Sequence, residues 1–156
     1  MADTDDVPWL DGDEEAMWLR LIGVVVRLPA ALDAQLRRDA GLSHFDYQIL
    51  AGLSMADTGT RRMSEMAEFT ESSLSRLSHA CRRLEEQGWL VRYPDPDDGR
   101  VTLASLTEAG YSKVAETAPG HVRTVRRLVF DPLTKQQVRQ LSQALARIQG
   151  SIASHE

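Results

Sequence analysis

Helical spacing dominates the apolar positions in the first quarter of the chain. Steps of three and four residues predict a long helix over residues 13–40. Its apolar positions are Met17, Leu21, Val24, Val25, Leu28, Leu32 and Leu36. Trp18 and Val26 are among the apolar residues on its other faces, so we expect it to be buried on several sides, against a second subunit. Pro29 predicts a kink, and Gly41 predicts the helix end.

Three shorter helices are predicted next, separated by turn residues. Ser43 is an N-cap candidate with Asp46 three residues on, a weak capping box. The apolar face of that helix is Phe45, Ile49, Leu50 and Leu53. Residues 58–62 are a connector, for which a brief strand is one interpretation. Ser64 opens a third helix, and a fourth spans residues 72–87, ended by Gly88. Two short helices joined by a tight turn are typical of a helix-turn-helix.

A hairpin pattern follows directly. Residues 89–93 are strand-like, residues 94–99 are rich in proline, aspartate and glycine, and residues 100–106 alternate as a returning strand. A hairpin behind a helix-turn-helix predicts a winged helix over residues 43–106, with the wing at 89–106.

Two more helices complete the chain. Thr107 caps a fifth helix that reaches about residue 129 and is interrupted by Pro119-Gly120, and Thr134 with Gln137 forms a capping box for the last helix. Apolar residues of that last helix are spaced 3, 4, 3, 4, as in a coiled coil. They are Val138, Leu141, Leu145, Ile148 and Ile152. Such a seam packs either on its own domain or on a partner.

The fold class expected is therefore mainly α with a small β-hairpin wing. We expect an acidic flexible leader at residues 1–12 and a single domain at residues 13–156. Within that domain a winged helix-turn-helix lies between N- and C-terminal helices, 13–40 and 107–152, which we expect to form a dimer.

Composition narrows the class of protein. The chain has 156 residues, 42% of them apolar and 26% charged, as in an ordinary soluble domain. A single cysteine excludes a disulfide framework and fits a reducing compartment. The longest apolar stretch is too short and too charged for a membrane span, and the acidic N-terminus is unlike a signal peptide. We expect a cytoplasmic protein with no membrane contact.

The net charge of −5 argues against a nucleic-acid partner, but its distribution weakens that argument. Residues 1–20 carry seven acidic residues and one arginine, and the remaining chain is almost balanced. Sixteen of the 18 basic residues are arginine, whose planar head suits phosphates and guanine. A GC-rich genome gives the same bias.

The fourth helix carries the clearest candidate chemistry. Its predicted core stripe is Leu74, Leu77, Cys81, Leu84 and Gly88. Away from that stripe lie small hydroxyls and basic residues, namely Ser72, Ser73, Ser75, Arg76, His79, Arg82 and Arg83. Hydroxyls at a helix N-terminus suit phosphates, and an arginine suits guanine in the major groove. The alternative is a solvated face with no ligand.

The hairpin tip is the second candidate. Arg100 on a projecting wing suits the narrow, negative minor groove of DNA, and Asp98 is placed to orient it. The alternative is an ordinary exposed turn with a weak ion pair.

Several short segments in this order resemble the MarR family of transcriptional regulators. They are Leu42-Ser43, Gln48-Ile49-Leu50, Met63-Ser64-Glu65-Met66-Ala67, Ser72-Ser73-Leu74-Ser75-Arg76-Leu77, Arg83 to Arg92, Asp98-Gly99-Arg100 and Leu106-Thr107-Glu108-Ala109-Gly110. The resemblance covers roughly residues 14–150. It implies a homodimer that binds double-stranded DNA as a sequence-specific regulator, most simply a repressor acting on a pseudo-palindromic operator.

The resemblance also assigns residues. It places the recognition helix at residues 72–87 and DNA contacts at Ser72, Ser73, Ser75, Arg76 and His79, with Arg100 and Asp98 as the wing pair. We expect Arg82 and Arg83 to contact phosphates, although Arg83 neighbours the buried stripe. Gly99 departs from members that carry a further basic residue there. It further implies a pocket for a small aromatic effector, for which Trp18, Phe45 and Tyr47 are candidates, although such aromatics are more often core residues. It implies no cofactor.

Other function classes find little support in the sequence. Cys81 lies on the buried stripe rather than where redox-sensing relatives carry their cysteine, and the histidines are scattered without metal-ligand spacing. Enzyme motifs are absent from the sequence, so we expect no catalysis. A winged-helix module that binds proteins instead of specific DNA is the alternative, because fold alone does not establish function. The operator, the effector, the direction of regulation and the role of the leader are left open.

Overall fold

The described part of the chain, residues 7–155 of a computed structural model, is a helical protein with one small sheet. Its elements are α1 (Gly12–Ala40), α2 (His44–Ser54), β1 (Thr60–Arg62), α3 (Met63–Phe69), α4 (Leu74–Glu86), β2 (Leu90–Pro94), β3 (Thr102–Leu106), α5 (Glu108–Val125), η2 (Arg126–Phe130) and α6 (Lys135–Ala153). The expected fold class is confirmed. Residues 1–6 of the expected leader lie outside the described residues.

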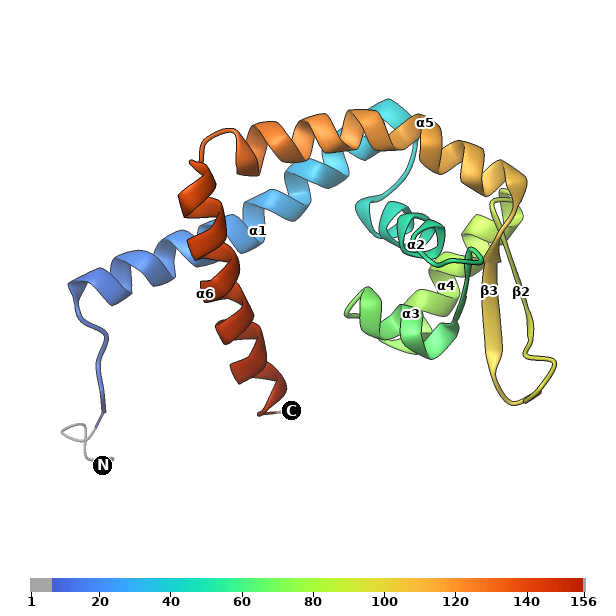
Figure 1. Cartoon of the computed structure of the whole chain (residues 1–156), viewed down its shortest axis with the longest axis horizontal. Coiled ribbons are helices and arrows are strands. Elements are labelled where there is room, and N and C mark those ends of the chain that lie inside the picture. Colours follow the sequence, from blue (N-terminus) through green and yellow to red (C-terminus); the bar gives the residue numbers. More distant parts are fainter. Residues whose placement is uncertain (1–6, 156) are drawn as a thin grey trace.

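Helices α1 and α5 pack against each other, and the winged helix-turn-helix and α6 extend from this pair. In Figure 1, α1 and α5 run side by side across the top, the winged helix-turn-helix hangs from one end, and α6 descends near the other. Within residues 7–155, none of these helices combines the length and the apolar character that a bilayer crossing requires.

Capping residues set both ends of helix α1. The Asp11 carboxylate accepts hydrogen bonds from the backbone of Asp13 and Glu14, and the Glu14 side chain accepts one from the Asp11 backbone in return. The helix therefore begins at Gly12, one residue earlier than expected. It continues through Pro29 and ends at Gly41, whose φ of 68° is the left-handed conformation that terminates helices.

Helix α2 begins as the sequence indicates, but its capping is one-sided. Ser43 Oγ accepts a hydrogen bond from the Asp46 backbone at 3.0 Å. The Asp46 carboxylate does not return to Ser43; instead it accepts a hydrogen bond from Arg83 on α4. The weak capping box predicted here is thus wrong in its second half, because a tertiary ion pair takes the carboxylate.

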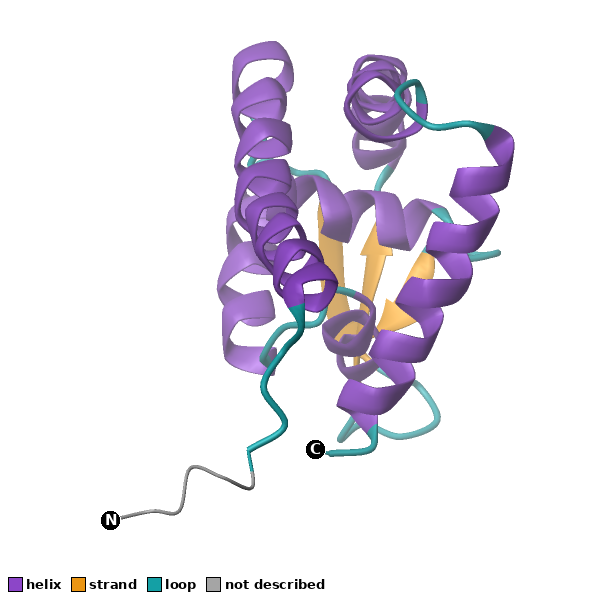
Figure 2. Cartoon of the chain, turned by 90° about the vertical axis from the view of Figure 1, so that its left-hand side faces the viewer, coloured by secondary structure: helices purple, strands orange, loops and turns teal. Residues whose placement is uncertain are grey.

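The wing is part of a three-stranded antiparallel sheet in the order β1-β3-β2. Strand β1 is the brief strand of the connector, and it pairs with β3 so that Thr60 lies opposite Ser105, with 2.6 Å between their hydroxyl oxygens. In Figure 2 the strands lie behind the helices, because they stand at the end of the molecule where Figure 1 shows β2 and β3. Strand β1 leads directly into α3, so its pairing with β3 connects the base of the wing to the start of α3. A two-stranded hairpin lacks this connection.

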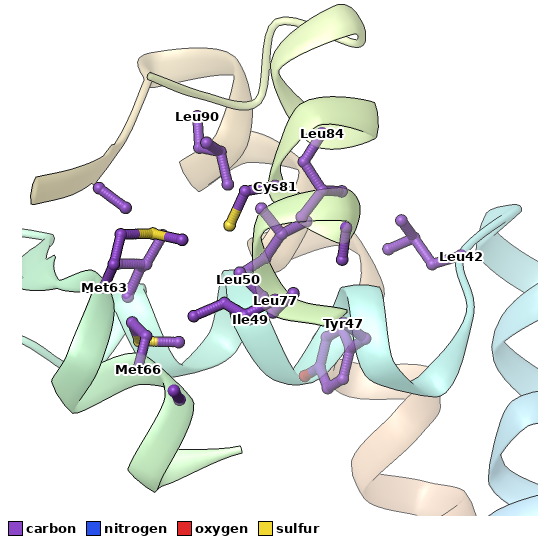
Figure 3. Close-up of a cluster of buried hydrophobic side chains, with 14 of the residues drawn as sticks. Leu42, Tyr47, Ile49, Leu50, Met63, Met66, Leu77, Cys81, Leu84 and Leu90 are labelled. Atoms are coloured by element: carbon purple, nitrogen blue, oxygen red, sulfur yellow. The ribbon is translucent and has the colours of Figure 1, made fainter. Parts of the chain in front are cut away.

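One hydrophobic core holds the winged helix together and joins it to the end of α1 (Figure 3). Helices α2, α3 and α4 and strand β2 all contribute to it. Its fully buried large side chains are Leu36, Leu42, Ile49, Leu50, Leu53, Met66, Leu77, Leu84, Leu90 and Cys81. Because α4 and β2 share this core, the helix and the wing keep a fixed relation to each other.

Helix α5 is continuous where an interruption was expected at Pro119-Gly120. Proline removes one backbone hydrogen bond, but α5 packs against both α1 and α2, and that packing outweighs the local cost. The hydroxyls of Thr117 and Thr124 donate to carbonyls one turn back, those of Lys113 and Gly120. The irregularity appears later, as the wider turns of the π-helix η2.

Helix α6 begins with the reciprocal capping box of Thr134 and Gln137. It has no buried residue in the single chain, and its predicted seam is exposed at Leu141, Leu145, Ile148 and Ile152. The first half of α1 is similarly exposed at Met17, Trp18, Leu19, Ile22, Val24, Val25 and Val26. The apolar surface on α1 and α6 thus has no covering partner within the described chain.

Candidate nucleic-acid interface

Helix α4 presents a polar face on the side opposite the core. Leu77, Ala80, Cys81 and Leu84 are buried. At 100° per residue, the side chains that project directly away from them are those of Ser75, His79, Arg82 and Glu86, and all four are exposed. The sequence placed the first three of these correctly on the exposed face.

Leu74 does not belong to the buried stripe, so that part of the predicted core is wrong. It is 55% exposed, and it lines a groove with residues of α3 and with Ile152 of α6. Leu74 is the first residue of α4, where the helix projects beyond the core. Gly88 also lies after the helix rather than on its stripe, with a φ of 73° in the turn that leads to β2.

The start of α4 differs from the prediction as well. The helix begins at Leu74, with Ser73 as its N-cap, whose Oγ accepts a hydrogen bond from the Arg76 backbone at 3.2 Å. Ser72 lies in the preceding turn, 2.9 Å from the Thr70 hydroxyl. Both serines therefore lie at the N-terminal end of α4 but outside its first turn, and the helix covers residues 74–86 instead of 72–87.

The turn before Ser72 contains a residue that sequence reasoning did not single out. Glu71 has a φ of 47°, the one non-glycine residue of the described chain in the left-handed region. This conformation costs free energy for any residue with a Cβ. Glu71 lies in the turn that ends α3, where the Ser72 backbone donates to the Ala67 carbonyl at 2.9 Å, just before the N-cap of α4.

One flank of α4 faces α2, and both arginines on it have partners there. The Arg76 guanidinium carbon lies 4.2 Å from the centre of the Phe45 ring. Arg83 Nη2 donates to Asp46 Oδ1 at 2.8 Å. Arg83 was expected as a phosphate contact; the structure shows that part of its charge is already balanced by Asp46.

The other flank of α4 is joined to the wing. Arg92 of β2 donates through its side chain to Glu85 Oε2, from Nε at 3.0 Å and from Nη2 at 2.6 Å, and to Ser78 Oγ at 3.0 Å. Hydrogen bonds from Arg92 to Glu85 raise the already high pKa of this arginine. In the sequence, Arg92 stands out only as a charged residue in an otherwise apolar strand.

The tip of the wing holds the predicted ion pair. Arg100 Nε and Nη2 donate to the two carboxylate oxygens of Asp98, at 3.1 and 3.3 Å. These hydrogen bonds lower the pKa of Asp98. The Arg100 side chain is 92% exposed, so the pair contributes little to stability and leaves the guanidinium accessible.

A groove lies between α1 and the α2 flank of α4. It has a volume of about 890 Å³ and is lined by Pro29, Ala30, Asp33, Arg37, Ser43, His44, Phe45, Asp46, Gln48, Thr70, Arg76, His79, Ala80 and Arg83. Of the three aromatic residues suggested for an effector pocket, Phe45 lines this groove. Tyr47 is buried against His121, and Trp18 lies on the exposed half of α1, so the single chain does not bring the three together.

Two of the histidines that looked scattered in the sequence meet in the structure. The rings of His44 and His121 have centres 6.0 Å apart at the junction of α1, α2 and α5, and His121 Nδ1 lies 3.3 Å from Gln35 Oε1. Burial lowers the pKa of both imidazoles. His44 and His121 are 77 positions apart, so no local sequence pattern indicates this contact.

Cys81 is buried, as the helical stripe predicted. Burial raises the pKa of its thiol to about 11, so the reactive thiolate form is scarce at neutral pH. Cys81 therefore acts as a small apolar core residue.

Comparison with known proteins identifies the group to which this architecture belongs. The pattern of the MarR family matches residues 40–101, from the end of α1 to the wing turn. The structure resembles that of Sco3205, a MarR family transcriptional regulator from Streptomyces coelicolor solved in complex with DNA, with 39% identity, a TM-score of 0.89 and coverage of 94% of this chain and 92% of that one.

Two further relatives agree. AbsC, a MarR family transcriptional regulator also from Streptomyces coelicolor, is 34% identical with a TM-score of 0.90, over 95% of this chain and 99% of that one. The transcriptional repressor IacR of Pseudomonas putida is 30% identical over 57% of this chain and 53% of its own length.

The match to the curated relatives spans a little over half of their length. The two structural relatives, by contrast, match almost from end to end, and all of these relatives are named as regulators of transcription rather than as enzymes. With more than 30% identity over nearly the full length of both structures, the chain belongs to the MarR family of transcriptional regulators.

Proposed function

We propose that the protein is a sequence-specific DNA-binding transcriptional regulator that acts as a homodimer in the cytoplasm. The observation that carries this proposal is the exposed face of α4, with its serines, His79 and Arg82, beside a wing that ends in the exposed Arg100. An α-helix of this kind fits the major groove, and an arginine on a projecting hairpin fits the minor groove.

The residues proposed to contact DNA have separate roles. Arg76 and His79 face the bases, with Arg76 suited to guanine. Ser72, Ser73 and Ser75 meet phosphates at the N-terminal end of α4, where the helix dipole favours anions. Arg82, and Arg83 to a smaller extent, contact phosphates; Arg100 enters the minor groove, oriented by Asp98.

The proposed dimer uses the exposed apolar residues of α1 and α6. Burying such surface against a second copy is favourable because it removes it from water. Two-fold symmetry then requires a pseudo-palindromic operator whose half-sites lie about one helical turn, or roughly 34 Å, apart. The similarity to the repressor IacR favours repression as the direction of control.

Release of DNA by a small aromatic ligand is the regulatory part of the proposal. The groove that Phe45 lines has a volume of about 890 Å³, within the range of sites for small molecules, and Arg76 and Arg83 border it. A ligand bound there therefore contacts side chains that we propose for DNA. Trp18 and Tyr47 join this site only if a second copy or a movement of α1 brings them to it.

Fluorescence anisotropy tests the proposed function. Labelled DNA from immediately upstream of the protein's own gene is compared with a scrambled fragment of equal length and composition, at two salt concentrations. We expect tight, salt-dependent binding with a clear preference for the upstream fragment. Equal, weak binding to both, unchanged in Arg76→Ala and Arg100→Ala, favours the alternative of a protein-interaction module.

A further inference from the structure

The contact between Arg76 and Phe45 joins the proposed reading helix to the first turn of α2. Phe45 is held in place because α2 starts at a fixed point: Ser43 caps it, and the His44 backbone donates to Asp33 of α1 at 2.8 Å. The Phe45 ring packs against the core on one side. Its other side meets the Arg76 guanidinium, 4.2 Å from the ring centre.

The neighbouring ion pair fixes the same two helices. Asp46 follows Phe45 directly, is 14% exposed, and accepts the hydrogen bond from Arg83 at 2.8 Å. Arg76 and Arg83 are seven positions apart and so lie on the same flank of α4. Consecutive residues of α2 thus engage two arginines of α4, two turns apart, and set the distance between the helices.

Stacking leaves the hydrogen-bonding edge of Arg76 available. A guanidinium that lies over an aromatic ring uses its face, while its N–H groups point outward in the plane. Within residues 7–155, no hydrogen bond uses the side-chain nitrogens of Arg76. Arg82, one turn and a half further on, has neither a stacking partner nor an ion pair among these residues.

We propose that Phe45 is a positioning residue for sequence reading: its ring holds the Arg76 guanidinium in place before DNA arrives. This inference rests on the proposed function. A long side chain loses rotamer freedom when it binds a base, and a side chain that is already held loses less. Phe45 therefore increases the affinity for the preferred sequence more than the affinity for random DNA, although it is not itself a base contact.

Three variants separate the stack from general packing. Phe45→Leu keeps an apolar side chain but removes the aromatic face, and Phe45→Tyr keeps the face. Phe69→Leu is the matched control, because Phe69 also lies under an arginine, Arg61 at 5.4 Å, but that pair is outside α4. Each protein is titrated with an operator selected by the wild type from a random duplex library, and with random duplex DNA.

We expect Phe45→Leu to lower the ratio of specific to random binding by about two- to fivefold, the effect of losing one exposed cation–π contact. Phe45→Tyr and Phe69→Leu keep the wild-type ratio. In the free protein, the NMR signals of the Arg76 side-chain methylene protons carry a ring-current shift that Phe45→Leu removes and Phe45→Tyr retains.

Four results overturn the inference. An unchanged specificity ratio in Phe45→Leu means that the ring does not position Arg76. An equal loss in Phe45→Leu and Phe45→Tyr assigns Phe45 to packing instead. Absence of the ring-current shift in the wild type removes the stack itself, without reference to DNA. If the wild type selects no sequence from the library while the shift is present, the proposed DNA function fails, and with it the role of Phe45 in reading, although the stack exists.

Discussion

Arginines on and around α4 have different surroundings, and these decide what each can do. Arg92 is largely shielded and donates to Glu85 and Ser78, so it is committed to holding the wing against α4. Arg83 forms an ion pair with Asp46. Arg76 lies over the Phe45 ring but keeps its N–H groups available, and Arg82 is exposed. Of this group, Arg76 and Arg82 are therefore the best placed to meet DNA.

Replacing Arg76 and replacing Arg82 should weaken DNA binding in different ways. Arg76→Ala is expected to weaken operator binding by about 1–3 kcal/mol and to relax selectivity at one base pair, because a bidentate base contact is lost. Arg82→Ala should weaken all sequences alike and reduce the slope of log affinity against log salt by about one phosphate contact. Titrations with single-base-pair operator variants measure both. The same salt-dependent, sequence-independent loss in both variants contradicts the assignment of Arg76 to base reading.

Glu71 allows a stability test of the turn before α4. Replacing it with glycine removes the steric cost of a φ of 47°, and we expect the free energy of unfolding to rise by about 0.5–1 kcal/mol. Glu68→Gly is the control, since the same substitution inside α3 should lower the free energy of unfolding by about 1 kcal/mol. Urea denaturation measures both. A loss of stability in Glu71→Gly contradicts the inferred strain.

Helices and strands meet at a few tight contacts that fix the interface in space. At the start of α5, the Thr107 hydroxyl donates to the Gly88 carbonyl at 2.6 Å and accepts a hydrogen bond from the Gly110 backbone at 3.0 Å. A Cβ on Gly110 overlaps the Trp89 carbonyl oxygen. Helix α5 can lie this close to the base of the wing because residue 110 has no side chain.

Gly110→Ala and Gly120→Ala form a matched pair on α5. Because the overlap at residue 110 involves backbone, we expect Gly110→Ala to lower the free energy of unfolding by about 1–3 kcal/mol. The nearest atom to a Cβ on Gly120 is Gln35 Nε2 at 3.7 Å, an ordinary contact, so Gly120→Ala should raise stability by up to about 1 kcal/mol. Thermal unfolding distinguishes them, and equal effects at the two positions contradict the packing described at the wing.

At the scale of the whole molecule, exposed apolar residues gather on α1 and α6. Leu141, Leu145 and Ile148 are each about two-fifths exposed. Exposed apolar residues in such number on a protein mark an interaction surface. The partner that we propose is a second copy of the chain, and two-fold symmetry would then give the dimer two copies of α4.

Substitution within the seam tests this assembly. Leu145→Arg places a charge in the proposed interface and should shift the protein from dimer to monomer in sedimentation velocity experiments, with a midpoint at least tenfold higher in concentration. Val91→Arg is the control, because Val91 is similarly exposed but lies on the wing. A wild-type protein that is already monomeric, or a Leu145→Arg protein with an unchanged dimer, contradicts the role of α6.

Sequence patterns anticipated those features that depend on neighbours in the chain. Gly41, Thr107 and the Thr134–Gln137 pair mark helix limits through contacts within a few residues, so they could be read directly. The exposure of Leu74, the continuity of α5 through Pro119-Gly120 and the pairing of β1 with β3 depend on where distant segments pack. For the same reason the sequence revealed neither the Asp46–Arg83 pair nor the stack of Arg76 on Phe45. The assignment of residues to DNA contacts stays a prediction.

Hydroxyl-radical footprinting of the full-length protein on its selected operator tests the central claim most directly. The account predicts two protected regions related by a two-fold axis, with centres about one helical turn, or roughly 34 Å, apart, as expected for two copies of α4 in successive major grooves. Protection should weaken in Arg76→Ala. A single protected region without two-fold symmetry, or no protection at protein concentrations where the dimer is complete, would contradict it.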